Sequence, residues 1–111
     1  MLVLNRFVDP SDPAFVERAH AALAALSACA GYVSGRLTRA LDDPAHWTLV
    51  TEWESVGAYR RALGNFDVKV HATPFLSESR DEPSAFETLA SAEPGAAVVV
   101  TGSDRAAEPW R

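Results

Sequence analysis

The chain is 111 residues long, the size of one domain with a modest core, and its 48% apolar and 23% charged residues are typical of a folded globular protein. Its formal net charge of −5 disfavours a nucleic-acid partner, because an acidic protein repels phosphate backbones. No apolar run approaches the roughly 20 residues that a membrane-spanning helix needs, so no membrane association is expected.

The first third of the sequence predicts a strand followed by a helix. Alternating apolar residues predict the strand over residues 2–8. Apolar residues at helical spacing then predict a helix over residues 15–26, with Ser11 or Asp12 as its N-cap. We expect Gly31 to close this helix in the left-handed conformation, which glycine adopts without steric cost.

The middle of the chain predicts a hairpin and a broken helix. Changes of hydrophobic period define four further elements: a strand over residues 32–41, a strand over 46–53, a helix over 55–73 that is interrupted at 64–65, and a strand over 84–89. Ser55 is the expected cap of the broken helix, and Pro74 is expected to limit it. The resulting order is β-α-β-β-α-β, which predicts an α+β domain of ferredoxin-like type.

The predicted strands carry large apolar residues on both sides. In the first strand Leu2, Leu4 and Val8 oppose Val3 and Phe7. Helices cover only one face of a ferredoxin-like sheet, so a second layer must cover the other face. A second copy of the chain is the simplest cover and predicts a homodimer, while the alternative is that the C-terminal tail folds over the sheet.

The domain is expected to span residues 1–90, followed by a C-terminal extension over residues 91–111. Glu93-Pro94-Gly95 is a turn signal, and residues 96–101 are predicted to form a fifth strand. This strand either folds back on the last core strand or reaches across to a partner subunit. Disorder is expected beyond Gly102.

Two polar residues stand out as candidates for chemistry. Asn5 lies in the middle of the most apolar strand, where its amide needs either backbone partners or a ligand oxygen. His71 lies on the broken helix, where it is either a surface residue or a base, an axial ligand or a hydrogen-bond donor. His46 beside Asp42 and Asp43 is expected to be solvated, so no metal site is predicted.

An aromatic set suggests an enclosed, mostly apolar pocket for a small planar ligand. The candidate substrate-binding aromatic residues are Phe7, Trp47, Trp53, Tyr59, Phe66 and Phe75. Core packing explains most of them, yet an interrupted helix above a sheet often leaves a cavity whose aromatic walls suit such a ligand. Arg36 either binds a carboxylate or phenolate at the mouth of that pocket or makes a surface ion pair.

Residues 2–90 resemble the antibiotic biosynthesis monooxygenase family of dimeric α+β barrels. The resemblance rests on the strand that carries Asn5, on Gly31-Tyr32-Val33-Ser34-Gly35 after the first helix, and on His46-Trp47-Thr48-Leu49-Val50-Thr51-Glu52-Trp53-Glu54-Ser55 before the second. Members of that family include cofactor-independent monooxygenases that oxidise aromatic polyketides or quinols with molecular oxygen. The resemblance implies that Asn5 orients the substrate or an oxygen intermediate and that His71 accepts a proton.

The same resemblance leaves alternatives to this activity. The haem-degrading branch of the family uses an Asn, a His and a Trp, and Asn5 and His71 fall at matching places, but Ala62 occupies the place of the Trp. A third hypothesis is a dimeric binding module without enzymatic activity. The expected protein is therefore a homodimeric monooxygenase without a cofactor that acts on a small aromatic compound, with haem as the alternative cofactor.

The expected location is the cytoplasm. The N-terminus has no basic start and no continuous apolar region of the kind that a secretory signal carries. The single cysteine, Cys29, excludes an internal disulfide and fits a reducing compartment.

Overall fold

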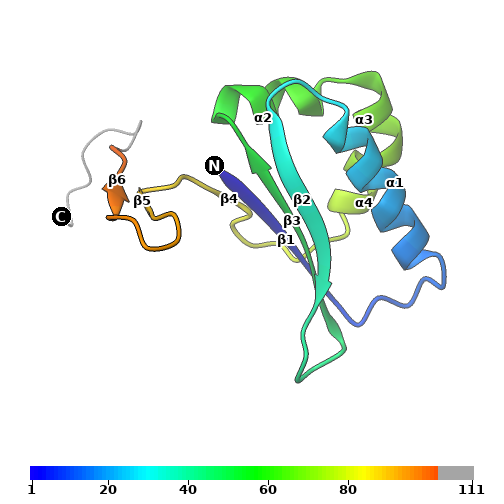
Figure 1. Ribbon diagram of the computed structural model, residues 1–111. Helices are drawn as coiled ribbons and strands as arrows, with labels where there is room; N and C mark the ends of the chain where they lie inside the picture. Colours follow the sequence, from blue (N-terminus) through cyan, green and yellow to red (C-terminus); the bar gives the residue numbers. More distant parts are fainter. Residues whose placement is uncertain (103–111) are drawn as a thin grey trace.

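A four-stranded antiparallel sheet forms the body of the protein in a computed structural model that describes residues 1–102. Its strands are β1 (Leu2–Val8), β2 (Tyr32–Arg39), β3 (His46–Trp53) and β4 (Ala85–Phe86), in the order β2-β3-β1-β4. The helices are α1 (Phe15–Ser27), α2 (Val56–Leu63), α3 (Phe66–His71) and α4 (Thr73–Leu76). Figure 1 shows α1, α3 and α4 on one side of the sheet, with α2 at one end. This arrangement confirms the predicted ferredoxin-like α+β class.

The core lies between the sheet and the helices. Val3, Asn5 and Phe7 alternate along the helix-facing side of β1, and all three are buried. Cross-strand pairing places Leu49 opposite Asn5 and Trp47 opposite Phe7, which continues the same face onto β3. The helical region contributes apolar side chains to this layer, namely Phe15, Ala19, Ala22, Leu26, Ala58, Ala62, Val68, Ala72 and Phe75.

Two local signals have the predicted geometry, although only one of them marks a helix boundary. Gly31 is left-handed as expected but does not close α1, which ends at Ser27 with Ala28 as its C-cap. Gly31 has φ +86°, and a Cβ atom there would lie 2.4 Å from the Cβ of Ala58, so both conformation and space require glycine. The side chain of Ser55 accepts a hydrogen bond of 3.0 Å from the backbone N–H of Ala58, which confirms it as the cap of α2.

Two other boundaries differ from the prediction. Asp12 does not cap α1, because its carboxylate accepts from the N–H of Ala14 and forms a turn before the helix, which begins at Phe15. Pro74 does not limit the helical region, since it lies in the first turn of α4. The first-turn N–H groups of a helix need no intrahelical partner, so proline is tolerated there.

The C-terminal part differs most from the prediction. Only Ala85 and Phe86 pair as the fourth strand, where a strand over residues 84–89 was predicted. The chain then forms a separate hairpin of β5 (Ala90–Ser91) and β6 (Val99–Val100), so the predicted fifth strand pairs with β5 and not with β4. In Figure 1 this hairpin projects from the sheet on the side away from the helices. The predicted disorder beyond Gly102 falls outside the described residues.

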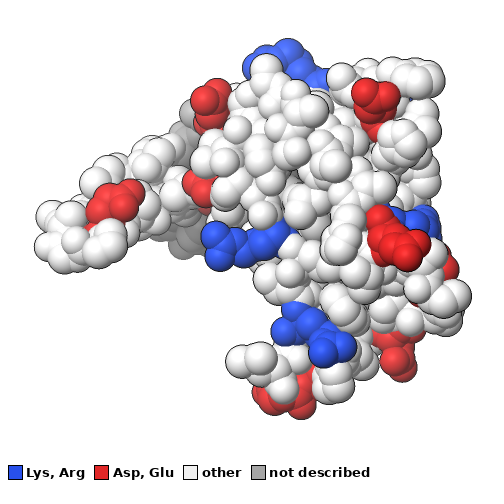
Figure 2. All heavy atoms as spheres, turned by 45° about the vertical axis from the view of Figure 1, so that its right-hand side comes forward, with Lys and Arg blue, Asp and Glu red and all other residues white. Residues whose placement is uncertain are grey.

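The face of the sheet opposite the helices has no covering layer within the chain that the structure describes. Leu2 pairs with Phe86 and Leu4 pairs with Val50 on this face, and both Leu2 and Phe86 are exposed. Figure 2 shows separate acidic and basic side chains on the view that brings the helix side forward, without a continuous patch of one sign. No helix within residues 1–102 is long and apolar enough to cross a membrane.

Candidate functional site

A groove lies between α2 and β4, with a volume of about 620 Å³. This volume falls within the range of small-molecule sites. Its lining residues come from the N-terminus, from one side of α2, and from β4 and the residue after it; they are Met1, Val56, Tyr59, Arg60, Leu63, Ala85, Phe86 and Glu87. We call this the α2–β4 groove. Most of its walls are apolar, with two charged side chains among them.

Tyr59 is the polar group set deepest in this wall. Its ring lies 5.4 Å from the ring of Trp53, which is buried and donates its indole N–H to the Thr51 hydroxyl over 2.9 Å. Burial raises the pKa of the Tyr59 phenol above its ordinary value, because the charged phenolate is poorly solvated there. Tyr59 therefore stays protonated at neutral pH and can donate a hydrogen bond to an oxygen of a ligand.

The groove also holds a cation that is available to a ligand. Arg60 lies on its wall, and no ion pair of Arg60 occurs among the residues that the structure describes. The N-terminal ammonium of Met1 is engaged instead, since it donates to the carbonyl of Trp53 over 2.8 Å. A phenol donor next to a guanidinium on an apolar wall suits an aromatic compound that carries an anionic oxygen.

Asn5 lies beside this groove along β1 but does not line it. It is 7% exposed, and its amide donates a hydrogen bond of 3.2 Å to the hydroxyl of Ser79. Ser79 in turn donates to the carbonyl of Leu76 over 2.7 Å. Asn5 therefore has a side-chain partner that is 74 residues away in sequence.

The aromatic rings at the far end of β1 fill their own space. Phe7, Phe15 and Phe75 lie with ring centroids 4.6 to 5.2 Å apart, and Trp47 lies 5.3 Å from Phe15. We call these four the aromatic cluster. A notch of about 200 Å³ adjoins Phe7 and Phe15 at the surface. The four residues of the aromatic cluster thus pack against one another. Three of them, Phe7, Trp47 and Phe75, were predicted to bind substrate.

His71 lies on the other side of α3 from the core. It is exposed and lines a shallow groove with Asn65, Asp67, three alanines of α1 and the C-cap residue Ala28. Asn5 is buried on the helix-facing side of β1, whereas His71 is exposed on α3. The groove that His71 lines is not lined by Asn5.

The remaining candidates lie apart from the groove. Arg36 pairs with Val50 on the free face of the sheet and is exposed, and Phe66 is 76% exposed at the start of α3. His46 makes an ion pair of 3.1 Å with Asp43 at the tip of the hairpin. No cluster of three His, Cys, Asp or Glu side chains suited to a metal occurs within the described part of the chain.

Sequence reasoning missed most of the groove. It singled out Tyr59 but not Arg60, Leu63 or Phe86, which line the same hollow. The spacing of Val56, Tyr59, Arg60 and Leu63 at three and four residues was a usable signal, because such positions share one side of a helix. No local signal places Phe86 against them, since that contact depends on the course of the chain after α4.

The fold and the groove define a small ferredoxin-like α+β protein with a ligand-sized hollow between a helix and an edge strand. The family model of antibiotic biosynthesis monooxygenases matches residues 5–73, more than half of the sequence. The chain belongs to this family. No match to a curated protein was found.

Several solved structures share the fold. SnoaB, a cofactor-independent oxygenase from Streptomyces nogalater, is 29% identical with a TM-score of 0.60, covering 79% of this chain and 94% of that chain. Rv0793 from Mycobacterium tuberculosis is 19% identical with a TM-score of 0.59, covering 96% and 97%. A conserved protein from Methanosarcina mazei Go1 is 17% identical with a TM-score of 0.61, covering 76% and 84%. The last two show likeness of fold alone.

Proposed function

We propose that the protein is a cofactor-independent monooxygenase that binds a small phenolic or quinone-like aromatic compound in the α2–β4 groove and oxidises it with molecular oxygen. Family membership and the similarity to SnoaB support the class of reaction. The observation that carries the choice of site is the pairing of Tyr59 and Arg60 on the wall of an apolar groove of about 620 Å³.

The proposed reaction needs a substrate that can itself reduce dioxygen. An anthrone-like substrate loses a proton and passes an electron to oxygen, and the two radicals combine to a peroxide. Loss of water from the peroxide leaves a carbonyl where the ring had a methylene group. One oxygen atom enters the product, the other leaves as water, and the substrate supplies all four electrons.

The groove contributes by favouring the deprotonated substrate. The Tyr59 hydroxyl donates a hydrogen bond to the ring oxygen, and Arg60 supplies a positive charge beside it. Both interactions are stronger with the anion than with the neutral phenol, so they lower the pKa of the substrate. The apolar walls limit the water that would otherwise solvate the charge.

Substitution at Arg60 tests this site. Oxygen uptake is measured with a panel of hydroxyanthrones and hydroquinones for Arg60→Gln and for Arg61→Gln, the adjacent arginine that does not line the groove. The proposal expects a KM about three- to tenfold higher for Arg60→Gln, from loss of one charge-assisted hydrogen bond, and no change for Arg61→Gln. Equal behaviour of the two variants contradicts the assignment.

A competing proposal is that Asn5 and His71 have the catalytic roles that the family resemblance implies. His71→Ala distinguishes the two, since His71 lies in a different hollow from Tyr59. Activity in His71→Ala favours a substrate anion stabilised by the α2–β4 groove. Loss of activity with unchanged stability favours His71 as the proton acceptor.

We also propose that the protein works as a homodimer through the free face of the sheet. Leu4 pairs with Val50 in the middle of that face, beside the exposed Leu2 and Phe86. Val50→Lys is expected to give a folded species that sediments at the monomer mass of 11.9 kDa. Val16→Lys, on the helix side, serves as the matched control. A wild-type protein that is folded and monomeric at micromolar concentration contradicts the proposal.

A binding module without enzymatic activity is the second candidate function. The aromatic cluster favours it, because those rings fill the space that a buried substrate would need. Quenching of tryptophan fluorescence by a hydroxyanthraquinone, without oxygen uptake from any hydroxyanthrone, would identify this function.

A further inference from the structure

The segment between α4 and β4 runs along the free edge of β1. We call residues 77–84 the strap. The N–H of Arg80 donates to the carbonyl of Arg6, and the N–H of Leu4 donates to the carbonyl of Ser84, both over 2.7 Å. These two backbone bonds flank Asn5 and set the strap directly beside it.

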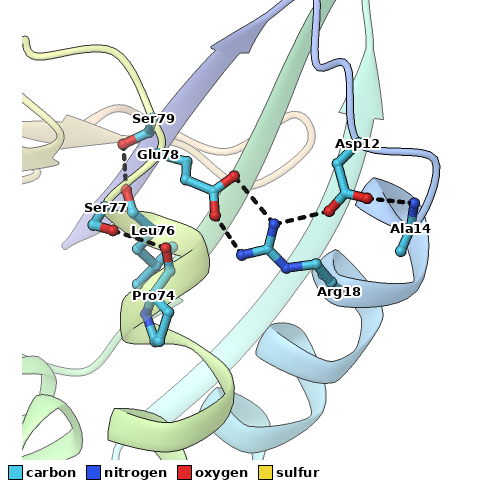
Figure 3. Close-up of polar contacts among 8 residues, drawn as sticks. All are labelled: Asp12, Ala14, Arg18, Pro74, Leu76, Ser77, Glu78 and Ser79. Atoms are coloured by element: carbon cyan, nitrogen blue, oxygen red, sulfur yellow. Dashed lines mark hydrogen bonds and ion pairs between the residues drawn. The ribbon is translucent and has the colours of Figure 1, made fainter.

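One ion-pair group fastens the strap to α1. Arg18 donates from Nη1 to Asp12 over 3.0 Å and to Glu78 over 3.1 Å, and its Nη2 donates to the second oxygen of Glu78. Figure 3 shows the guanidinium of Arg18 between the two carboxylates. The same guanidinium lies 5.7 Å from the ring centroid of Phe75. This group therefore joins the strap to both the helix and the aromatic cluster.

A second ion pair fastens the strap to β1. Arg6 donates from Nε and Nη2 to the two carboxylate oxygens of Glu82 over 2.9 and 3.0 Å. The side chains of both pairs are more than a third exposed on at least one partner. Exposed ion pairs stabilise weakly and are screened by salt, so this fastening is far weaker than the core beneath it.

The strap lies against the side chain of Asn5, a polar residue on the core-facing side of β1. Asn5 is 7% exposed, and its side-chain amide donates to the hydroxyl of Ser79 in the strap. The notch of about 200 Å³ beside the aromatic cluster is lined by Asp12 and Glu78, the two acids that hold Arg18. Glu78 of the strap therefore borders this notch while it is paired with Arg18.

We propose that the strap is a releasable cover, which opens when the Glu78 and Glu82 pairs break and exposes the side chain of Asn5 to water. Segments held by few apolar contacts open locally without unfolding the whole domain. This opening does not rest on the proposed function.

Hydrogen exchange followed by NMR on the full chain tests the opening. The reporters are the backbone amides of Arg80 and Leu4 and the side-chain amide protons of Asn5. Removal of one pair, in Glu78→Gln or Glu82→Gln, is expected to speed their exchange about two- to fivefold, and removal of both about four- to twenty-five-fold. Raising the salt concentration should speed exchange in the wild type and have little effect on the double variant.

The control is Glu17→Gln, which makes the same change of charge at an exposed acid of α1. The proposal is overturned if the double variant exchanges like this control. It is also overturned if Arg80 and Leu4 respond while the Asn5 side chain does not, since the strap then loosens without uncovering Asn5. Absence of oxygen uptake with a normal exchange response refutes the proposed function and leaves the strap opening intact.

Discussion

The two ends of β1 both lie beside aromatic side chains, but only one end is closed by helices. Near Phe7, rings from α1 and α4 pack into the aromatic cluster and leave only a surface notch. Near Met1, Tyr59 and Phe86 stand on the two walls of an open groove. The cover explains the difference, because two helices close the first end while a strand of two residues borders the second. Aromatic residues thus stabilise the core where α1 and α4 pack over them. They line the candidate site where the edge strand β4 is short.

Truncating one phenylalanine at each end gives the largest expected contrast. Phe75 is 1% exposed and Phe86 is 44% exposed. Phe75→Ala should lower the free energy of unfolding by about 3–5 kcal/mol, because it removes buried contacts and leaves a cavity. Phe86→Ala should cost about 1 kcal/mol or less, as is usual for surface positions. Urea unfolding measures both, and equal losses would show that the two ends are packed alike.

The sequence predicted the elements at both ends of β1, but not the long-range contacts that distinguish the closed end from the open one. Gly31 and Ser55 were placed correctly because their signals are local, one a backbone conformation and the other a cap. Asn5 was recognisable as a polar residue in an apolar strand, but its partner Ser79 follows from the path of a distant loop. The same holds for Arg18 and Glu78, which are 60 residues apart. Local pattern therefore predicted the elements, while long-range contact decided which hollow stayed open.

Filling the groove should separate ligand binding from stability. Ala85 lines the groove and is exposed, so Ala85→Trp places a large side chain in the hollow without crowding the core. The affinity for a hydroxyanthraquinone, measured by fluorescence quenching, should fall about tenfold or more, while the urea midpoint changes little. Val16→Trp, at an exposed position of α1 outside both hollows, is the control. Unchanged affinity in Ala85→Trp would place the ligand elsewhere.

Removing the Tyr59 hydroxyl should have a smaller effect. Tyr59→Phe keeps the ring against Trp53 and deletes only the hydrogen-bond donor. The value of kcat/KM should fall about three- to tenfold, as for the loss of one hydrogen bond in the transition state. In the wild type, the raised pKa of Tyr59 favours folding below pH about 10 and is lost at higher pH as the phenol ionises. Tyr59→Phe should therefore reduce the alkaline loss of stability measured by urea unfolding.

The smallest expected effect concerns the ion pairs of Asp12 and Glu82, near the end of β1 that α1 and α4 close. Hydrogen bonds to the Ala14 N–H and to Arg18 lower the pKa of Asp12, and the hydrogen bond to Arg6 lowers that of Glu82. A lowered folded-state pKa means that both carboxylates favour folding above their unfolded values of about 3.9 and 4.3, and that this contribution disappears as the pH falls through the lower folded values.

The wild type should therefore exchange the Arg80 amide at a pH-corrected rate that is constant above pH about 5 and rises below pH about 4. Glu82→Gln should show a faster rate at neutral pH and a shallower rise in acid, because the carboxylate that pairs with Arg6 in the wild type is absent. An acid response of equal steepness in both proteins would mean that Glu82 does not hold the strap. The aromatic cluster alone would then close this end of β1. Packing, and not the ion pairs of the strap, would keep Asn5 away from solvent.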